Sequence, residues 1–270
     1  MLKDYHKHSF DDQISFREKS ILKHINNAIP PVSTIWDYHF YSALKSYFID
    51  NDVSSAKQHF YICGRVDVYA NLKRNENSTE WAKDDFYGAI AKRMNLRTNL
   101  MAAVLSDHPV MIAQYGQLTY PDYQKEFKAG EITVLTEGAK SIMRKDWAGL
   151  QRVVEYIDTK NKLKTQPWKA QIPDRDFFEG MLEKNQPKIE AALAELLTPK
   201  RVKQRDDFET ERELFARMAV LYAKLAYFNG YELSIRHPLL MQDLLPVNPT
   251  EKYDEVYDFL KEDKLKRNLI

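Results

Sequence analysis

The chain has 270 residues, with 40 Lys and Arg against 39 Asp and Glu, so its formal net charge at pH 7 is +1. This balance excludes the strongly basic profile of a dedicated nucleic-acid coat and the acidic, aromatic-poor profile of a disordered chain. A chain of this length buries enough apolar surface to fold without disulfides or metal. The single cysteine, Cys63, excludes an intramolecular disulfide and any multi-cysteine zinc or iron–sulfur site.

The apolar stretches and the glycine content exclude further classes of protein. The sequence starts without an apolar signal-peptide core, and no stretch approaches the roughly 18 apolar residues of a membrane span. Only 8 residues are glycine, and neither glycine-rich pattern of a phosphate-binding loop occurs. We therefore expect a cytoplasmic protein with no membrane partner and no nucleotide cofactor.

Along most of the chain, apolar residues recur at intervals of three and four, which indicates helices. A motif of two aromatics, any residue, a small residue and an aliphatic one occurs at 40–44, 86–90 and 177–181. Short polar breaks follow such stretches, and Asp or Asn in a break is a helix N-terminal signal. The markers, spaced 56, 39 and 39 residues apart, are Asn51, Asp107, Asp146 and Asn185. The pattern predicts an all-α fold of stacked αα-hairpins, as either an irregular helical bundle or a repeat-like array.

Polar stretches join the hairpins, and the Lys-rich segment 158–173, with two prolines, has the composition of a linker. Hairpins bury their faces only against neighbours, so we expect a single all-helical domain over 1–270, with any subdivision near 158–173. The clearest helical pattern predicts one helix from Asp206 to Asn229, with Lys224 outside its apolar stripe and Gly230 ending it. The Pro-bounded segments beyond Gly230 predict a C-terminal cap that closes the stack.

No catalytic constellation is found. His6 and His8 lie in a polar segment that we expect to be frayed, and no partner stands at a metal-ligand spacing. Cys63, within an aromatic-rich stretch, is expected to be a small buried residue. Adjacent carboxylates such as Asp206 and Asp207 precede predicted helices, where negative charge favours the first turn. The remaining histidines are expected to be buried or at helix boundaries: His24, His39, His59, His108 and His237. We therefore predict no catalytic residue, no metal site, no cofactor and no enzyme activity, unless folding gathers dispersed histidines and carboxylates.

Charge is unevenly distributed, with a basic region over 138–173 and an acidic region over 174–263. Trp168 within the basic region and the Lys-rich stretch 261–267 are features that nucleic-acid binding can use. Such blocks are usually solvated faces, and the net charge is near zero. We therefore expect no nucleic-acid partner.

The C-terminal third carries a more specific pattern. It combines A-K-L-A with an aromatic, a G-Y-E turn, a Pro-bounded hydrophobic pair, L-L-P and a closing Y-D-F-L, preceded by the 177–182 stretch. In this pattern the chain resembles the immunity protein 49 family of bacterial polymorphic-toxin systems. The resemblance covers residues 80–262, is best over 174–262, and departs from the family at Met241, where a proline is expected. The residues that carry it, all in packing or turn positions, are Lys224, Gly230, Tyr231, Pro238, Leu245, Pro246, Asp258 and Phe259.

The resemblance implies an all-α protein that binds and neutralises a cognate toxin. Family members are associated with nuclease-type toxins, which implies a basic partner. An acidic block would then be the partner contact, consisting of Asp206, Asp207, Glu209, Glu211 and Glu213. The alternative function is a helical-repeat adaptor that binds a peptide or protein without a toxin role. The pattern leaves the oligomeric state open.

Overall fold

The computed structural model describes residues 2–26, 30–75, 97–119, 131–162, 170–205 and 211–261. These residues form helices, turns and irregular segments and no strand, which confirms the all-α prediction. None of their helices is both long enough and apolar enough to cross a bilayer. The α-helices are α1 (Leu2–His24), α2 (Val32–Phe48), α3 (Val53–Asn75), α6 (Arg97–Leu105), α7 (Pro109–Gln117), α9 (Glu131–Arg144), α10 (Trp147–Lys162), α12 (Ile172–Glu183), α13 (Gln186–Leu196), α14 (Pro199–Arg205) and α15 (Arg217–Phe228). Three short 3-10 helices are η1 (Glu211–Glu213), η2 (Gln242–Leu244) and η3 (Asp258–Leu260).

The chain divides into two compact units. The first unit comprises 1–94, 105–120 and 248–270, and the second comprises 95–104 and 121–247. The first therefore contains α1, α2, α3, α7 and η3, and the second contains α9 to α15 with η1 and η2. That the whole chain acts as a single domain stays a prediction. Residues 163–169 of the expected linker 158–173 lie outside the described residues, as does the 86–90 motif.

Tight turns between successive helices share one two-residue design. The first residue has a left-handed backbone, with φ between 54° and 61°, at Asn51, Asp107, Lys145 and Lys184. The second residue caps the next helix by accepting a hydrogen bond from the backbone N–H three residues on, over 2.8–3.1 Å. These caps are Asp52, His108, Asp146 and Asn185. The predicted breaks are confirmed, although Asn51 and Asp107 take the left-handed position and the residues after them form the caps.

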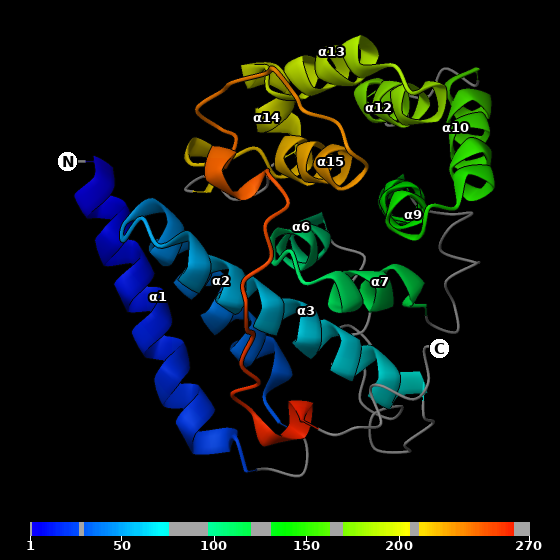
Figure 1. Ribbon diagram of the computed structural model, residues 1–270. Helices are drawn as coiled ribbons and strands as arrows, with labels where there is room; N and C mark the ends of the chain where they lie inside the picture. Colours follow the sequence, from blue (N-terminus) through cyan, green and yellow to red (C-terminus); the bar gives the residue numbers. More distant parts are fainter. Residues whose placement is uncertain are drawn as a thin grey trace. The chain divides into compact units, whose positions relative to one another are not determined.

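In the first unit, α1, α2 and α3 pack side by side (Figure 1). A buried carboxylate, Asp67 of α3, joins this layer to α7. It accepts hydrogen bonds from Trp36 Nε1 at 3.2 Å and from the Tyr115 hydroxyl at 3.1 Å. His6 is buried within α1, so the expectation of a frayed N-terminal segment is wrong at this position.

Residues 248–261 form a mostly irregular segment, the C-terminal strap, which follows α3 (Figure 1, orange to red). Lys57 contacts its beginning at Asn248, and Arg65 contacts its end at Leu260. The strap therefore runs in the same direction as α3. The segment after Gly230, which the sequence predicts as one cap, belongs partly to the second unit and partly to the first.

The second unit is built on the hairpins α9–α10 and α12–α13, and α15 packs against α9 and α13. Every residue of α15 from Arg217 to Ala226 is buried. The Tyr222 ring stacks on Phe177 with centroids 4.4 Å apart, and its hydroxyl donates to Asp174 at 2.9 Å. A central helix buried on all sides explains why one apolar stripe did not describe this segment.

The predicted helix from Asp206 to Asn229 is too long, because α15 begins at Arg217. Ala216 is extended, and its N–H donates to the Leu239 carbonyl at 2.9 Å instead of continuing a helix. The predicted end is confirmed. Gly230 has φ +85°, its N–H donates to Tyr227, and the next N–H donates to Ala226, which is a Schellman motif.

Lys224 lies in the interior, although its position off the apolar stripe predicted an outer face. It is fully buried, and its Nζ donates to the carbonyls of Leu244 at 2.6 Å, Leu245 at 3.2 Å and Pro246 at 3.1 Å. A buried ammonium needs such acceptors, because it has lost its hydration. This one side chain therefore attaches the L-L-P segment to α15.

Replacing this lysine tests its structural role. We expect Lys224→Met to lower the free energy of unfolding by about 2–4 kcal/mol, because three buried carbonyls lose their donor. Lys203→Met, at an exposed position of α14, is the matched control and should change it by less than about 0.5 kcal/mol. Urea unfolding measures both, and equal midpoints for the two variants would show that the Lys224 contacts contribute nothing.

Candidate functional site

The three chain segments of the first unit meet at a buried ion pair. Lys57 Nζ lies 2.8 Å from Asp107 Oδ2, and the two side chains are 3% and 0% exposed. The same Nζ donates to the Asn248 carbonyl at 2.5 Å, and the Asn248 N–H donates to Asp107 at 3.3 Å. One residue from each segment thus takes part, and the strap begins at this point.

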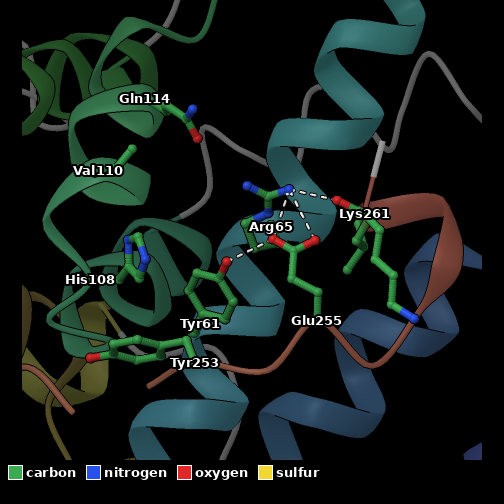
Figure 2. Close-up of a pocket in the computed structure, with 9 residues that line it drawn as sticks. Tyr61, Arg65, His108, Val110, Gln114, Tyr253, Glu255 and Lys261 are labelled. Atoms are coloured by element: carbon green, nitrogen blue, oxygen red, sulfur yellow. Dashed lines mark hydrogen bonds and ion pairs between the residues drawn. The ribbon is translucent and has the colours of Figure 1, made fainter. Parts of the chain in front are cut away.

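Beside this junction lies a cavity of about 480 Å³ with walls from all three segments (Figure 2). From α3 come Tyr61 and Arg65. The turn before α7 and α7 itself contribute His108, Val110 and Gln114, and the strap contributes Tyr253, Glu255, Leu260 and Lys261. All nine residues belong to the first unit.

Arg65 is the central charged group of this cavity and is only 6% exposed. One terminal nitrogen, Nη2, holds the strap by lying 3.0 Å from Glu255 Oε1 and donating to the Leu260 carbonyl at 2.7 Å. The Tyr61 hydroxyl donates to the same Glu255 oxygen at 2.8 Å. Burial raises the pKa of Tyr61, so this hydroxyl stays a donor at neutral pH.

Three rings form the opposite wall. The Tyr61, His108 and Tyr253 rings pack with centroids 4.8–4.9 Å apart. His108 Nδ1 accepts the Met111 N–H, and burial lowers the pKa of this imidazole, so it is neutral at pH 7. The Tyr253 hydroxyl donates to the Ser106 carbonyl at 2.5 Å. The wall therefore presents mainly ring surface to the cavity, while the Tyr61 hydroxyl is held by Glu255 and the Tyr253 hydroxyl by the Ser106 carbonyl.

A second cavity, of about 530 Å³, lies in the second unit against α12 and α13. Its three cations are already paired with carboxylates. Arg175 contacts Asp158 and Glu179, Lys188 contacts Glu179 and Glu183, and Arg201 contacts Glu195. This cavity offers a ligand fewer unmatched groups than the one at Arg65.

Two histidines, His39 of α2 and His59 of α3, form a hydrogen-bonded chain with Tyr257 of the strap. His39 Nδ1 lies 2.8 Å from His59 Nδ1, and His39 Nε2 lies 2.9 Å from the Tyr257 hydroxyl. Burial lowers the pKa of His39 well below 6.5, helped by His59, and lowers that of His59 to about 4. Both rings are therefore neutral at pH 7, as the buried or boundary positions predicted for them imply.

The predicted partner contact lies partly outside the described residues, since Asp206, Asp207 and Glu209 fall there. Glu211 is buried and pairs with Arg217 at 3.1 Å, whereas Glu213 is exposed. Exposed Glu213 is thus the one member of the block that the described residues present to a partner.

The family-pattern residues lie in both units. Lys224 contacts Leu245 and Pro246, and Gly230 ends α15 with Tyr231 as the last residue of its motif. Pro238 is exposed at a turn. In η3, Asp258 pairs with Lys261 at 2.7 Å, and the Phe259 ring packs on Tyr69 at 4.8 Å.

Sequence analysis missed the Arg65 cavity, because its walls come from segments nearly 200 residues apart. One local signal was present: Arg65 and Asp67 are charges within an otherwise apolar stretch of α3. Cys63, in the same stretch, is fully buried as predicted, and burial raises the pKa of its thiol. No group of three His, Cys, Asp or Glu side chains suited to a metal ion occurs in the part of the chain that the structure describes.

Comparison with known proteins adds no relative. No protein-family model, no curated protein and no solved structure matches the chain. Function is therefore inferred from the residues themselves.

The two histidines predict acid sensitivity. Their folded-state pKa values lie below the ordinary 6.5, so the unfolded chain binds protons more readily as the pH falls. Stability should therefore be retained above pH 6.5 and decrease from there toward pH 4, by an amount on the order of a few kcal/mol. Urea unfolding at pH 7 and pH 5 measures the decrease.

The variant His39→Gln with His59→Gln should reduce this decrease, and His8→Gln, an exposed histidine of α1, should leave it unchanged. If the double variant loses as much stability between pH 7 and pH 5 as the unmodified chain, other groups cause the acid sensitivity.

Proposed function

We propose that this chain is an immunity protein that binds a cognate bacterial toxin and neutralises it by direct protein–protein contact, without catalysis. A nuclease effector is the toxin class that the family resemblance favours. The proposal follows from the C-terminal pattern described above.

One observation supports it most. Lys224 and the L-L-P segment stand some twenty residues apart, yet the lysine donates to the carbonyls of Leu244, Leu245 and Pro246. A chance collection of helix-packing residues has no reason to be joined in this way. The pattern thus behaves as one interdependent structural unit, which is what a family signature requires.

The chemistry of the buried groups is consistent with a binding role. The thiol of Cys63 is fully buried, and the rings of His39, His59 and His108 make contacts that hold helices or the strap. These groups, the candidates for nucleophile or general base, serve packing and capping among the described residues. Contact with a partner is a use of the surface that needs none of them.

A second candidate, a helical-repeat adaptor, is favoured by the turn design that recurs at four places along the chain. Stacked hairpins commonly form extended binding surfaces. Both candidates bind proteins, and they differ in the partner.

Co-expression separates them. The gene beside this one should encode a secreted protein with a C-terminal toxin domain. Induction of that domain alone should stop growth, and co-expression of this chain should restore it. An adaptor would leave growth arrested. As control, the same toxin should be co-expressed with Lys224→Met, whose weakened fold should protect less.

Charge reversal tests the acidic block. Asp206→Lys, Asp207→Lys and Glu213→Lys together should slow association with the toxin about tenfold or more at low salt, because complementary charge speeds encounter. The matched control reverses three exposed glutamates elsewhere, Glu18, Glu155 and Glu251. Stopped-flow or biosensor kinetics measure both, and equal association rates for the two variants would remove the block from the interface.

A further inference from the structure

Helix α1 carries large apolar side chains on two faces. Its inner face, against α2, includes the buried residues Phe10 and Ile21. Its outer face carries Tyr5, Phe16 and Leu22, which are 61%, 72% and 74% exposed and are the most exposed large apolar side chains of the described residues. A surface helix normally has one apolar stripe, and that stripe faces the core. The packing of the first unit therefore does not explain the outer set.

The exposed residues of α1 follow a regular spacing. Six of them, which we call the α1 stripe, succeed one another at alternating steps of three and four: Tyr5, His8, Asp12, Ser15, Lys19 and Leu22. This spacing forms one line along a helix and is the spacing by which two helices pair in a coiled coil. Phe16 lies beside Ser15 at the flank of the stripe. Because α1 forms the edge of the α1–α2–α3 layer (Figure 1), the described part of the first unit leaves this line uncovered.

A second copy of α1 complements the α1 stripe when the two helices run antiparallel. A two-fold axis at the midpoint of the stripe would set Tyr5 opposite Leu22 of the second copy at both ends. It would also set Asp12 opposite Ser15 of the second copy. Every contact would occur twice, as in any interface in which the same patch of two identical subunits meets itself. The apolar residues of the stripe would thus be covered at both ends.

Charge favours this occupant. Lys19 of the second copy would lie four residues, about 6 Å along the axis, from the point opposite Asp12, which a lysine side chain can span. No carboxylate of the described residues pairs with Lys19, and Asp12 contacts only the exposed imidazole of His8, at 3.5 Å. A parallel pair would instead place Asp12 against Asp12 and Lys19 against Lys19. Like charges placed together disfavour that arrangement, so charge selects the antiparallel one.

The area of contact sets the expected affinity. A buried aromatic side chain contributes about 150–250 Å², so Tyr5 and Phe16 of two copies supply at most roughly 600–1,000 Å². Specific protein interfaces bury about 1,200–2,000 Å² in total. With Leu22 and the polar members of the stripe added, the contact lies near the lower end of that range. We therefore expect a dissociation constant on the order of micromolar.

We propose that a second copy of this chain docks on the α1 stripe, and that the two α1 helices pair antiparallel to form a symmetric homodimer. The interface lies wholly on α1. It goes beyond the toxin-binding proposal and does not depend on it.

Sedimentation equilibrium on the full chain tests the dimer. At low salt, the average mass should rise from that of the monomer toward that of the dimer between about 1 and 200 µM. Phe16→Glu with Leu22→Glu should raise the dissociation constant at least about tenfold, because four carboxylates replace apolar contacts. The matched control is Val110→Glu with Val256→Glu, two exposed positions of the first unit outside α1, which should leave the constant unchanged.

A charge exchange tests the direction of the pair. Asp12→Lys alone brings ammonium groups together across the interface, and Lys19→Asp alone brings carboxylates together, so each should weaken the dimer about fivefold or more. The chain with both substitutions should dimerise as the unmodified chain does. The two positions lie seven residues, about 10.5 Å, apart on one helix, so a contact within α1 does not account for such a restoration.

Two results would overturn the proposal. One is a chain that stays monomeric at every concentration, or whose Phe16→Glu with Leu22→Glu variant dimerises as well as the control. The other is a double charge variant that stays as weak as Asp12→Lys and Lys19→Asp alone. Flotation with vesicles of phosphatidylcholine and phosphatidylglycerol examines a membrane surface as the other occupant. Binding of a monomer that forms no dimer in solution would assign the α1 stripe to lipid instead.

Discussion

The first unit depends on one buried ion pair, because Lys57, Asp107 and Asn248 come from its three separate segments. Removing one charge from such a pair leaves the other buried and uncompensated, which costs far more than an exposed pair contributes. The pair also places the walls of the Arg65 cavity, since α3, the start of α7 and the strap all leave from this point. The positions of the cavity walls therefore depend on this ion pair.

A second buried lysine binds backbone carbonyls of the chain just before Asn248. Lys224 holds the carbonyls of residues 244–246 in the second unit, and Lys57 holds that of Asn248 in the first. The chain passes from one unit to the other between 247 and 248. Irregular backbone lacks the internal hydrogen bonds of a helix, so its carbonyls need outside donors. An ammonium with three donors supplies several of them at once.

Local chemistry explains what could be predicted from the sequence. The turns were predictable because a left-handed residue and the capping side chain after it form their contacts within five residues of the chain, as at Asn185. The end of α15 at Gly230 is local in the same way. The long helix was wrong where a distant residue intervened, since Leu239 accepts the Ala216 N–H. The buried lysines and the cavity were not predictable, because an ammonium at Lys57 or Lys224 looks solvated until its distant acceptors are known.

The contrast between these lysines and Arg65 bears on the site. All three side chains donate to backbone carbonyls within residues 244–260. The two ammonium groups have few N–H donors that are not used in this way. A lysine at position 65 would suffice to hold the Leu260 carbonyl. Arginine instead brings a planar group that also contacts Glu255 and whose Nε–H has no acceptor among the described residues. Native proteins leave few such groups unmatched in their interior. Arg65 thus holds the strap at both Glu255 and Leu260, while its Nε–H has no acceptor among the described residues.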